Sequence, residues 1–342
     1  MIKLDSNENP FGPSALAVKA MQTALSDSSR YPDNDASSLC QKLAELHRVS
    51  TEQIMVTAGL TEFLGILART FLTGGLNAVT SERSFIVYRI ATHAASARLI
   101  EVPMLRDTFD LGGIAAAVNQ DTRIVFLANP NNPTSTLVTV DEVDQFLNNI
   151  PEHIVVVLDE AYHEFAADFA KRRGEMYSRS LEYVRGGRNV VVLRTFSKVH
   201  GLAGVRVGYG IASARLMASI SRQRALYCVS NLAQAGALAA LEDSVHIRRA
   251  VENNTDQSER LTHALFELGY AIPVPWANFL YCELGRDATS FAERLQREGI
   301  AVRALEQWGA PQAIRITIGT PEQNDALVRA LRKLSNMKLR NI

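Results

Sequence analysis

The chain has 342 residues, of which 47% are hydrophobic, so it is long enough for two domains or for one large domain with a smaller companion. Thirty-six basic residues balance thirty-six acidic ones, which argues against nucleic-acid binding and against attachment to an anionic membrane. The opening MIKLDSNENP carries acid and amide side chains where a signal peptide is apolar, and no apolar run approaches the ~20 residues that span a bilayer. Three isolated cysteines, Cys40, Cys228 and Cys282, indicate a reducing compartment, so we expect a cytoplasmic protein.

Predicted helices and strands alternate over the first two thirds of the chain. Apolar residues at helical spacing indicate the helices, and continuous apolar runs between polar residues indicate strands covered on both faces. The predicted helices are 14–25, 36–48, 62–71 and 87–96, and the predicted strands are 53–57, 77–80, 123–128, 153–158, 189–193 and 207–211. This alternation predicts an α/β fold with a mostly parallel sheet and helices on both sides.

The pattern changes after about residue 214. Three helices follow each other there, and the third is long enough to bridge two domains. The predicted elements are helices 214–224, 231–242 and 245–268, strand 278–283, helix 288–298, strands 300–304 and 313–318, and a helix from 321. They predict a second, smaller α/β domain.

Chemically useful groups follow several predicted strands, where parallel sheets gather their ligands. Strand 153–158 leads into Asp159 and Tyr162, and strand 189–193 leads into the segment TFSK, which ends at Lys198. Two other strands lead into NPNNPT and into a glycine turn before a helix. Each group alone has an ordinary structural explanation, such as a turn, a helix cap or a surface charge. Together they suit one ligand with a carbonyl, a ring nitrogen, a phenolate oxygen and a phosphate, which is pyridoxal 5'-phosphate.

The chain resembles the fold-type I aminotransferases that depend on pyridoxal phosphate and, more narrowly, the histidinol-phosphate aminotransferase family. The resemblance extends from residue 4 to about residue 324 and rests on LDSNENPFGPS, RYPD, NPNNPT, VVLDEAYHEF, LRTFSKVHGLAGVRVGY, GIAVRAL and IRITIGTPEQN. It implies a large cofactor-binding domain over residues 31–243. Residues 1–30 and 244–342 would form the small domain.

The resemblance also implies a role for each matching residue. Lys198 would form a Schiff base with the cofactor and then move the proton at the substrate Cα. Asp159 would pair with the pyridine nitrogen. Tyr162 and Asn132 would hydrogen-bond the phenolate oxygen, and Phe85 would stack on the ring.

The phosphate group would lie at the start of a helix, where free amides and the helix dipole favour an anion. Arginine suits this position because its planar fork grips phosphate oxygens in pairs. Tyr31 would reach the phosphate in the neighbouring subunit, which implies a homodimer with shared sites. The phosphate-binding residues implied within one subunit are Gly59, Leu60, Thr61, Thr195, Ser197 and Arg206.

Two arginines match the family's substrate-binding positions. Arg315 would hold the carboxylate of glutamate and the phosphate of histidinol phosphate in turn, and Arg303 would add a second phosphate contact. Asn9 would line the pocket. The partners implied are therefore a small amino donor and a 2-oxo acid. Because the histidines show no paired spacing and there is no CxxC pattern, we expect no metal site.

The sequence departs from the family in three places. Relatives usually carry an N-terminal arm before LDSNENP, so water exclusion is expected to differ here. The segment ERSFIVY lacks the usual proline and has phenylalanine where tyrosine is common, and AGLTE places Leu60 and Thr61 after the glycine. We expect transamination of histidinol phosphate with 2-oxoglutarate. The sequence leaves open an aromatic amino acid aminotransferase, and a decarboxylase acting on a phosphorylated amino acid such as threonine phosphate.

Overall fold

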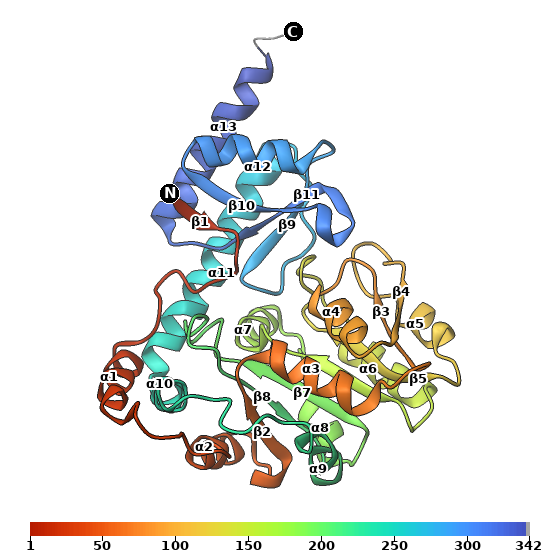
Figure 1. The fold of residues 1–342 in the computed structure, drawn as a ribbon. Helices are drawn as coiled ribbons and strands as arrows, with labels where there is room; N and C mark the ends of the chain where they lie inside the picture. The colour runs from red at the N-terminus through yellow and green to blue at the C-terminus, as the bar shows by residue number, and fades with distance from the viewer. Residues whose placement is uncertain (340–342) are drawn as a thin grey trace.

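The computed structural model describes the backbone of residues 1–339 and the side chains of residues 1–334. Two β-sheets organise the chain, a larger one in the lower part of Figure 1 and a smaller one above it. The larger sheet has the order β2-β8-β7-β6-β5-β3-β4, and the smaller sheet has the order β1-β10-β11-β9. The strands are β1 Ile2–Leu4, β2 Ile54–Thr57, β3 Asn77–Ser81, β4 Arg98–Val102, β5 Thr122–Ala128, β6 Val155–Asp159, β7 Val190–Thr195, β8 Gly208–Ile211, β9 Phe279–Glu283, β10 Ile300–Leu305 and β11 Ala310–Thr317.

The larger sheet is parallel except for β8, which runs antiparallel to both of its neighbours. Its central strands β6 and β7 are buried throughout, as their continuous apolar runs require. This arrangement confirms the predicted α/β fold. The edge strand β4 is absent from the predicted strands because its sequence, RLIEV, has exposed charged residues in place of an apolar run.

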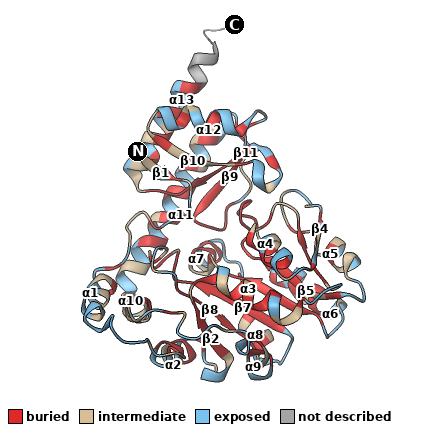
Figure 2. Cartoon of the chain, viewed as in Figure 1, coloured by how far each residue is buried: buried red, intermediate tan, exposed pale blue. Residues whose placement is uncertain are grey.

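Helices cover both faces of the larger sheet and leave its strands, apart from the edge strand β4, largely buried between them (Figure 2). Helices α5 to α8 are absent from the predicted elements. The signal for α6 was present, because Thr139 and Glu142 form a reciprocal capping box at its start. The α-helices are α1 Ala15–Ala24, α2 Ser37–His47, α3 Leu60–Phe71, α4 Val87–Ala94, α5 Leu111–Ala117, α6 Val140–Asn149, α7 His163–Arg173, α8 Ser180–Arg185, α9 Ala214–Ser221, α10 Asn231–Glu242, α11 Ser244–Glu267, α12 Ala288–Arg297 and α13 Pro321–Leu339.

The smaller sheet has its own hydrophobic core. Leu4, Leu280, Phe291, Ile316 and Leu331 belong to this core, so the first strand of the chain is built into the C-terminal domain. Strand β1 pairs in parallel with β10. The long helix α11 packs against α7 at one part of its length and against α13 at another, so it joins the two domains as expected.

The N-terminal helix α1 packs against α10, and its Ala17 belongs to the main core of the larger sheet. The exact domain boundaries stay a prediction. Within residues 1–339, no helix combines the length and the apolarity needed to cross a membrane. The same described residues contain no group of three or more histidine, cysteine or acidic side chains that could hold a metal ion.

Replacing Gly210 of β8 by alanine should destabilise the large domain. A Cβ at this position would collide with the ring of Phe63 on α3, which is fully buried. Overpacking of this kind costs about 1–3 kcal/mol, so we expect a lower urea midpoint for unfolding. Gly204→Ala is the matched control, because nothing lies within 4 Å of a Cβ added there. Equal midpoints for the two variants would contradict the packing described.

Candidate active site

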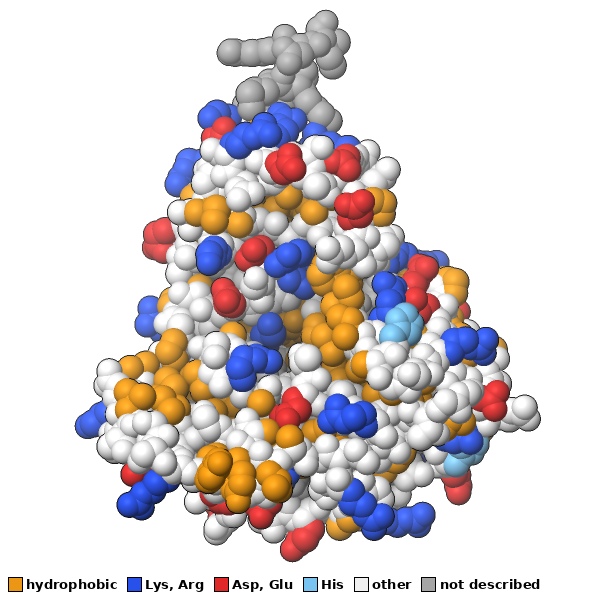
Figure 3. All heavy atoms as spheres, in the orientation of Figure 1, with side chains coloured by type: hydrophobic (Ala, Val, Ile, Leu, Met, Phe, Trp, Pro, Cys, Tyr) orange, Lys and Arg blue, Asp and Glu red, His pale blue; other side chains and the backbone are white. Residues whose placement is uncertain are grey.

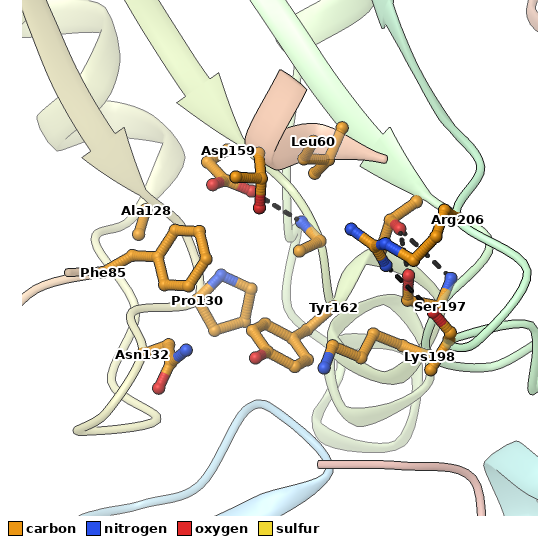
Figure 4. A pocket seen from close by; sticks show the side chains of 14 residues that line it. Leu60, Phe85, Ala128, Pro130, Asn132, Asp159, Tyr162, Ser197, Lys198 and Arg206 are labelled. Atoms are coloured by element: carbon orange, nitrogen blue, oxygen red, sulfur yellow. Dashed lines mark hydrogen bonds between the residues drawn. The ribbon is translucent and has the colours of Figure 1, made fainter. Parts of the chain in front are cut away.

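A cavity of about 180 Å³ lies where β5, β6 and β7 end and α3 begins. In the space-filling view the surface is hollowed between the two domains (Figure 3). Figure 4 shows the side chains that surround the cavity, which come from the strand ends, from α3 and from the loop before α4. They include ten residues expected from the sequence: Leu60, Thr61, Phe85, Asn132, Asp159, Tyr162, Thr195, Ser197, Lys198 and Arg206.

Lys198 follows the end of β7, and its amine reaches into the cavity (Figure 4). The Nζ atom lies 3.5 Å from the carbonyl oxygen of Ser6 and 5.6 Å from the centre of the Tyr162 ring. Burial lowers the pKa of this amine to about 7, and the positive charge of Arg315 acts in the same direction. A large fraction of the lysine is therefore neutral near pH 7 and able to act as a nucleophile or a base.

Asp159 is the last residue of β6 and is only 4% exposed. Its Oδ2 accepts a hydrogen bond of 2.8 Å from the hydroxyl of Tyr88, and its Oδ1 accepts one of 3.2 Å from the amide of Ala161. Burial raises the pKa of this carboxyl to about 6, although both hydrogen bonds act to lower it. Tyr88 is a candidate functional residue that the sequence does not predict. Nothing in the sequence distinguishes it from an ordinary core tyrosine of α4.

The start of α3 has the features of an anion site. Gly59 precedes the helix with φ +84°, and a Cβ at this position would collide with the guanidinium of Arg206. The absence of a side chain thus allows the arginine to lie against the helix N-terminus, where the first amides have no partner within the helix. Thr195 and Ser197 are hydrogen-bonded to each other beside it, with 3.0 Å between their hydroxyl oxygens.

Arg315 of β11 lies beside the cavity, against Asn132, and is 5% exposed. It donates to the side-chain oxygen of Asn132 at 2.6 Å and to the backbone oxygen of Asp5 at 2.8 Å. Its Nε is buried and has no hydrogen-bond partner among the described residues. Burial lowers the pKa of this guanidinium to about 10, so it is a positive charge at neutral pH that lacks full solvation. Arg303 is its register partner on β10 and donates to Asp5 as well.

Two further residues expected at the site, Tyr31 and Asn9, do not line the cavity of their own chain, and neither do Gly59, Arg303 and Arg315. Tyr31 is 82% exposed and stacks on Tyr227, with 4.7 Å between the ring centres. Asn9 donates to the backbone oxygen of Val199, the residue after Lys198, at 2.7 Å. Asn9 therefore attaches the N-terminal segment to the strand end that carries the lysine.

A buried polar network is formed by Glu160, Arg194 and Ser178. The first two residues are neighbours in sequence of the cavity residues Asp159 and Thr195. Arg194 donates to one oxygen of Glu160 from both Nε and an Nη atom, at 3.0 and 2.8 Å. Ser178 donates to the other oxygen at 2.6 Å. The arginine holds the pKa of Glu160 well below its usual range, against the effect of burial. No sequence pattern indicates that Glu160 and Arg194 form a pair, since they lie 34 residues apart.

The apoprotein should become more stable at neutral pH when Asp159 is replaced by asparagine. The folded-state pKa of about 6 lies above the ordinary value of 3.8, so ionisation of this carboxyl opposes folding. The cost is full above pH ~6, amounts to about 3 kcal/mol, and disappears below pH ~4. We therefore expect Asp159→Asn to raise the urea midpoint at pH 8 and to lose this advantage as the pH falls. The exposed Asp141→Asn is the control, and a pH-independent difference would contradict the electrostatic origin.

Comparisons with known proteins identify the family of the chain. Residues 1–331 match the family model of aminotransferase class I and II. The chain is 41% identical to a histidinol-phosphate aminotransferase of Akkermansia muciniphila over 98% of its length and 90% of the relative, and 40% identical to histidinol-phosphate aminotransferase 2 of Pseudomonas fluorescens over 98% and 89%. The structure is similar to a histidinol-phosphate aminotransferase of Sinorhizobium meliloti in complex with pyridoxal-5'-phosphate, with a TM-score of 0.89, 28% identity and coverage of 98% and 91%. The chain therefore belongs to the class I and II aminotransferases and, among them, to the histidinol-phosphate aminotransferase family.

Proposed function

We propose that this protein is a pyridoxal phosphate-dependent aminotransferase that moves the amino group of histidinol phosphate to 2-oxoglutarate, giving imidazole acetol phosphate and L-glutamate. The observation that carries the proposal is the pairing of Lys198 and Asp159 in one cavity, with an anion site at the start of α3. The names of the relatives support this choice of substrate.

The residues around the cavity fit pyridoxal phosphate. Because Gly59 has no side chain, the guanidinium of Arg206 lies against the start of α3, and together with the first α3 amides it would hold a phosphate. Asp159 is the buried acid for a ring nitrogen, and Phe85 offers a flat apolar face. When bound, the cofactor supplies an aldehyde for a lysine amine and a ring that stabilises negative charge at the substrate Cα.

The chain's own groups divide the remaining work. Asp159 holds the ring nitrogen in its protonated form, because a buried carboxylate gains most from a cationic partner. Tyr88 keeps this carboxylate oriented. Lys198 removes the proton from the substrate Cα and returns it, since an amine with a pKa of about 7 can act in both directions.

Arg315 is the proposed anchor for anionic substrates. It would bind a carboxylate in one half of the cycle and a phosphate in the other, as its planar fork suits both. Because the buried guanidinium lacks full solvation, an anion bound beside it would stabilise its positive charge. Arg303 lies beside it and is more exposed, so it would contact only the outer part of a longer substrate such as one with a phosphate tail.

The protein is further proposed to act as a cytoplasmic homodimer with shared sites. Tyr31 lies on the surface next to Tyr227 and Leu226, and exposed aromatic and aliphatic side chains of this kind suit a subunit interface. In such a dimer Tyr31 would reach the partner's phosphate site. All three cysteines are free, which suits a reducing compartment.

Adding histidinol phosphate alone to the protein loaded with pyridoxal phosphate should rapidly remove the visible absorption of the bound cofactor. L-phenylalanine should act much more slowly, and threonine phosphate should not release carbon dioxide. The Lys198→Ala variant should stay a folded dimer but show no turnover, because the amine that moves the proton is missing. Faster reaction with phenylalanine would make the protein an aromatic aminotransferase, and release of carbon dioxide from threonine phosphate would make it a decarboxylase.

Replacing Arg315 by alanine should weaken the binding of anionic substrates far more than the binding of the cofactor. We expect KM for histidinol phosphate and for 2-oxoglutarate to rise by about 100-fold, equivalent to one charge-assisted contact of ~3 kcal/mol. The dissociation constant of pyridoxal phosphate, measured by fluorescence, should change by less than threefold. Arg303→Ala is the comparison, with a smaller effect on histidinol phosphate and little on 2-oxoglutarate. Loss of cofactor binding in Arg315→Ala would show that the two anion sites are misassigned.

A further inference from the structure

Asn7 connects the N-terminal segment to both domains at the site. It is 1% exposed and adopts a left-handed backbone conformation, with φ +56°. Its backbone amide donates to the hydroxyl of Thr317 on β11 at 2.9 Å, and Asn278 donates to its backbone oxygen at 3.1 Å. Its side-chain Nδ2 donates to the hydroxyl of Tyr162 at 3.0 Å. Asn7 is therefore attached to the small domain and touches a cavity residue of the large domain.

The direction of the Asn7 amide follows from its neighbours. The hydroxyl of Thr317 lies 3.2 Å from Oδ1 and donates to it. In this orientation the hydroxyl of Thr317 accepts from the backbone amide of Asn7 and donates to its Oδ1, and Nδ2 faces Tyr162. The tyrosine oxygen must therefore accept this hydrogen bond, because an amide nitrogen has protons and no acceptor.

The hydroxyl proton of Tyr162 is left available for a ligand. Asn7 is the hydrogen-bond partner of this hydroxyl among the described residues, and it occupies the acceptor side. Burial raises the pKa of the phenol to about 12, so it keeps its proton throughout the neutral range. The charged groups that face the ring are Lys198, Arg315 and Asp159, and the ring edge packs against Phe279.

We propose that Asn7 is a positioning residue that directs the proton of Tyr162 into the cavity, toward the phenolate oxygen of pyridoxal phosphate. This rests on the proposed function, in which Tyr162 contacts that oxygen. By accepting from Asn7, the phenol becomes a better donor, since hydrogen bonds in a chain polarise one another. A stronger donor would stabilise negative charge on the phenolate oxygen. It would therefore favour loss of the proton from the neighbouring nitrogen, which Lys198 would contribute when it binds the cofactor.

The test is a pH titration of the visible absorption of the loaded protein without substrate. Asn7→Gly removes the amide and keeps the left-handed backbone free of strain. We expect its titration midpoint to rise by on the order of half a pH unit or more. Thr317→Val should raise the midpoint in the same direction, because the amide loses the hydroxyl that orients it. Lys3→Ala, at an exposed position of β1 in the same N-terminal segment, is the control, and its midpoint should match that of the wild type.

A double-mutant cycle with Tyr162→Phe separates positioning from structure. If Asn7 acts through the hydroxyl of Tyr162, Asn7→Gly changes the midpoint in the wild-type background and leaves it unchanged in the Tyr162→Phe background. Equal changes in both backgrounds, or no change in either, would overturn the proposal. Failure of the proposed function would look different, since the wild type would then show no visible absorption that depends on Lys198. Thermal unfolding of each apo variant verifies that it is folded.

Discussion

The buried ion pair between Glu160 and Arg194 fixes the two strand ends on which the site depends. Asp159 directly precedes Glu160 and Thr195 directly follows Arg194, so the pair joins the acid of the site to the segment that carries Lys198. Successive side chains along a strand point to opposite faces, which places the ion pair behind the cavity. Removing one partner of such a pair costs about 3–5 kcal/mol, because the other is left charged and buried. The strand ends are thus held by electrostatics as well as by the backbone ladder.

Burial shifts the pKa values of Asp159 and Lys198, the two central groups of the cavity, in opposite directions. Burial raises the pKa of Asp159 to about 6 and lowers the pKa of Lys198 to about 7, because low polarity penalises whichever form is charged. Each shift costs folding free energy in the apoprotein. In the proposed function, a ligand with a cationic ring nitrogen and a carbonyl would relieve both costs, since it would give the carboxylate a partner and use the amine in its neutral form. Under the proposed function, the free energy lost by burying these two groups would contribute to the affinity for the cofactor.

The sequence predicts the parallel sheet and most of the cavity, because these depend on apolar runs and on groups that directly follow a strand. Asp159 and Lys198 are of this kind, and the glycine before α3 is another. The sequence does not reveal contacts that link distant segments through a single hydrogen bond. Tyr88 reaches Asp159 across 71 residues and Asn7 reaches Tyr162 across 155, and neither separation leaves a local pattern. Helices such as α5, with two glycines in LGGIAAA, were missed because local preference there opposes the helix.

The pairing of β1 with β10 has a consequence for how the chain matures during its synthesis. Ile2 pairs with Ile300, so the first residues to leave the ribosome have no partner until nearly the whole chain has been made. At 5–20 residues per second, this delay is roughly 15–60 s. The large domain can fold during that interval, but Arg315 and Thr317 of β11, which contact Asn132 and Asn7, have not yet been made. The contacts of Arg315 with Asn132 and of Thr317 with Asn7 consequently form only after translation of the small domain.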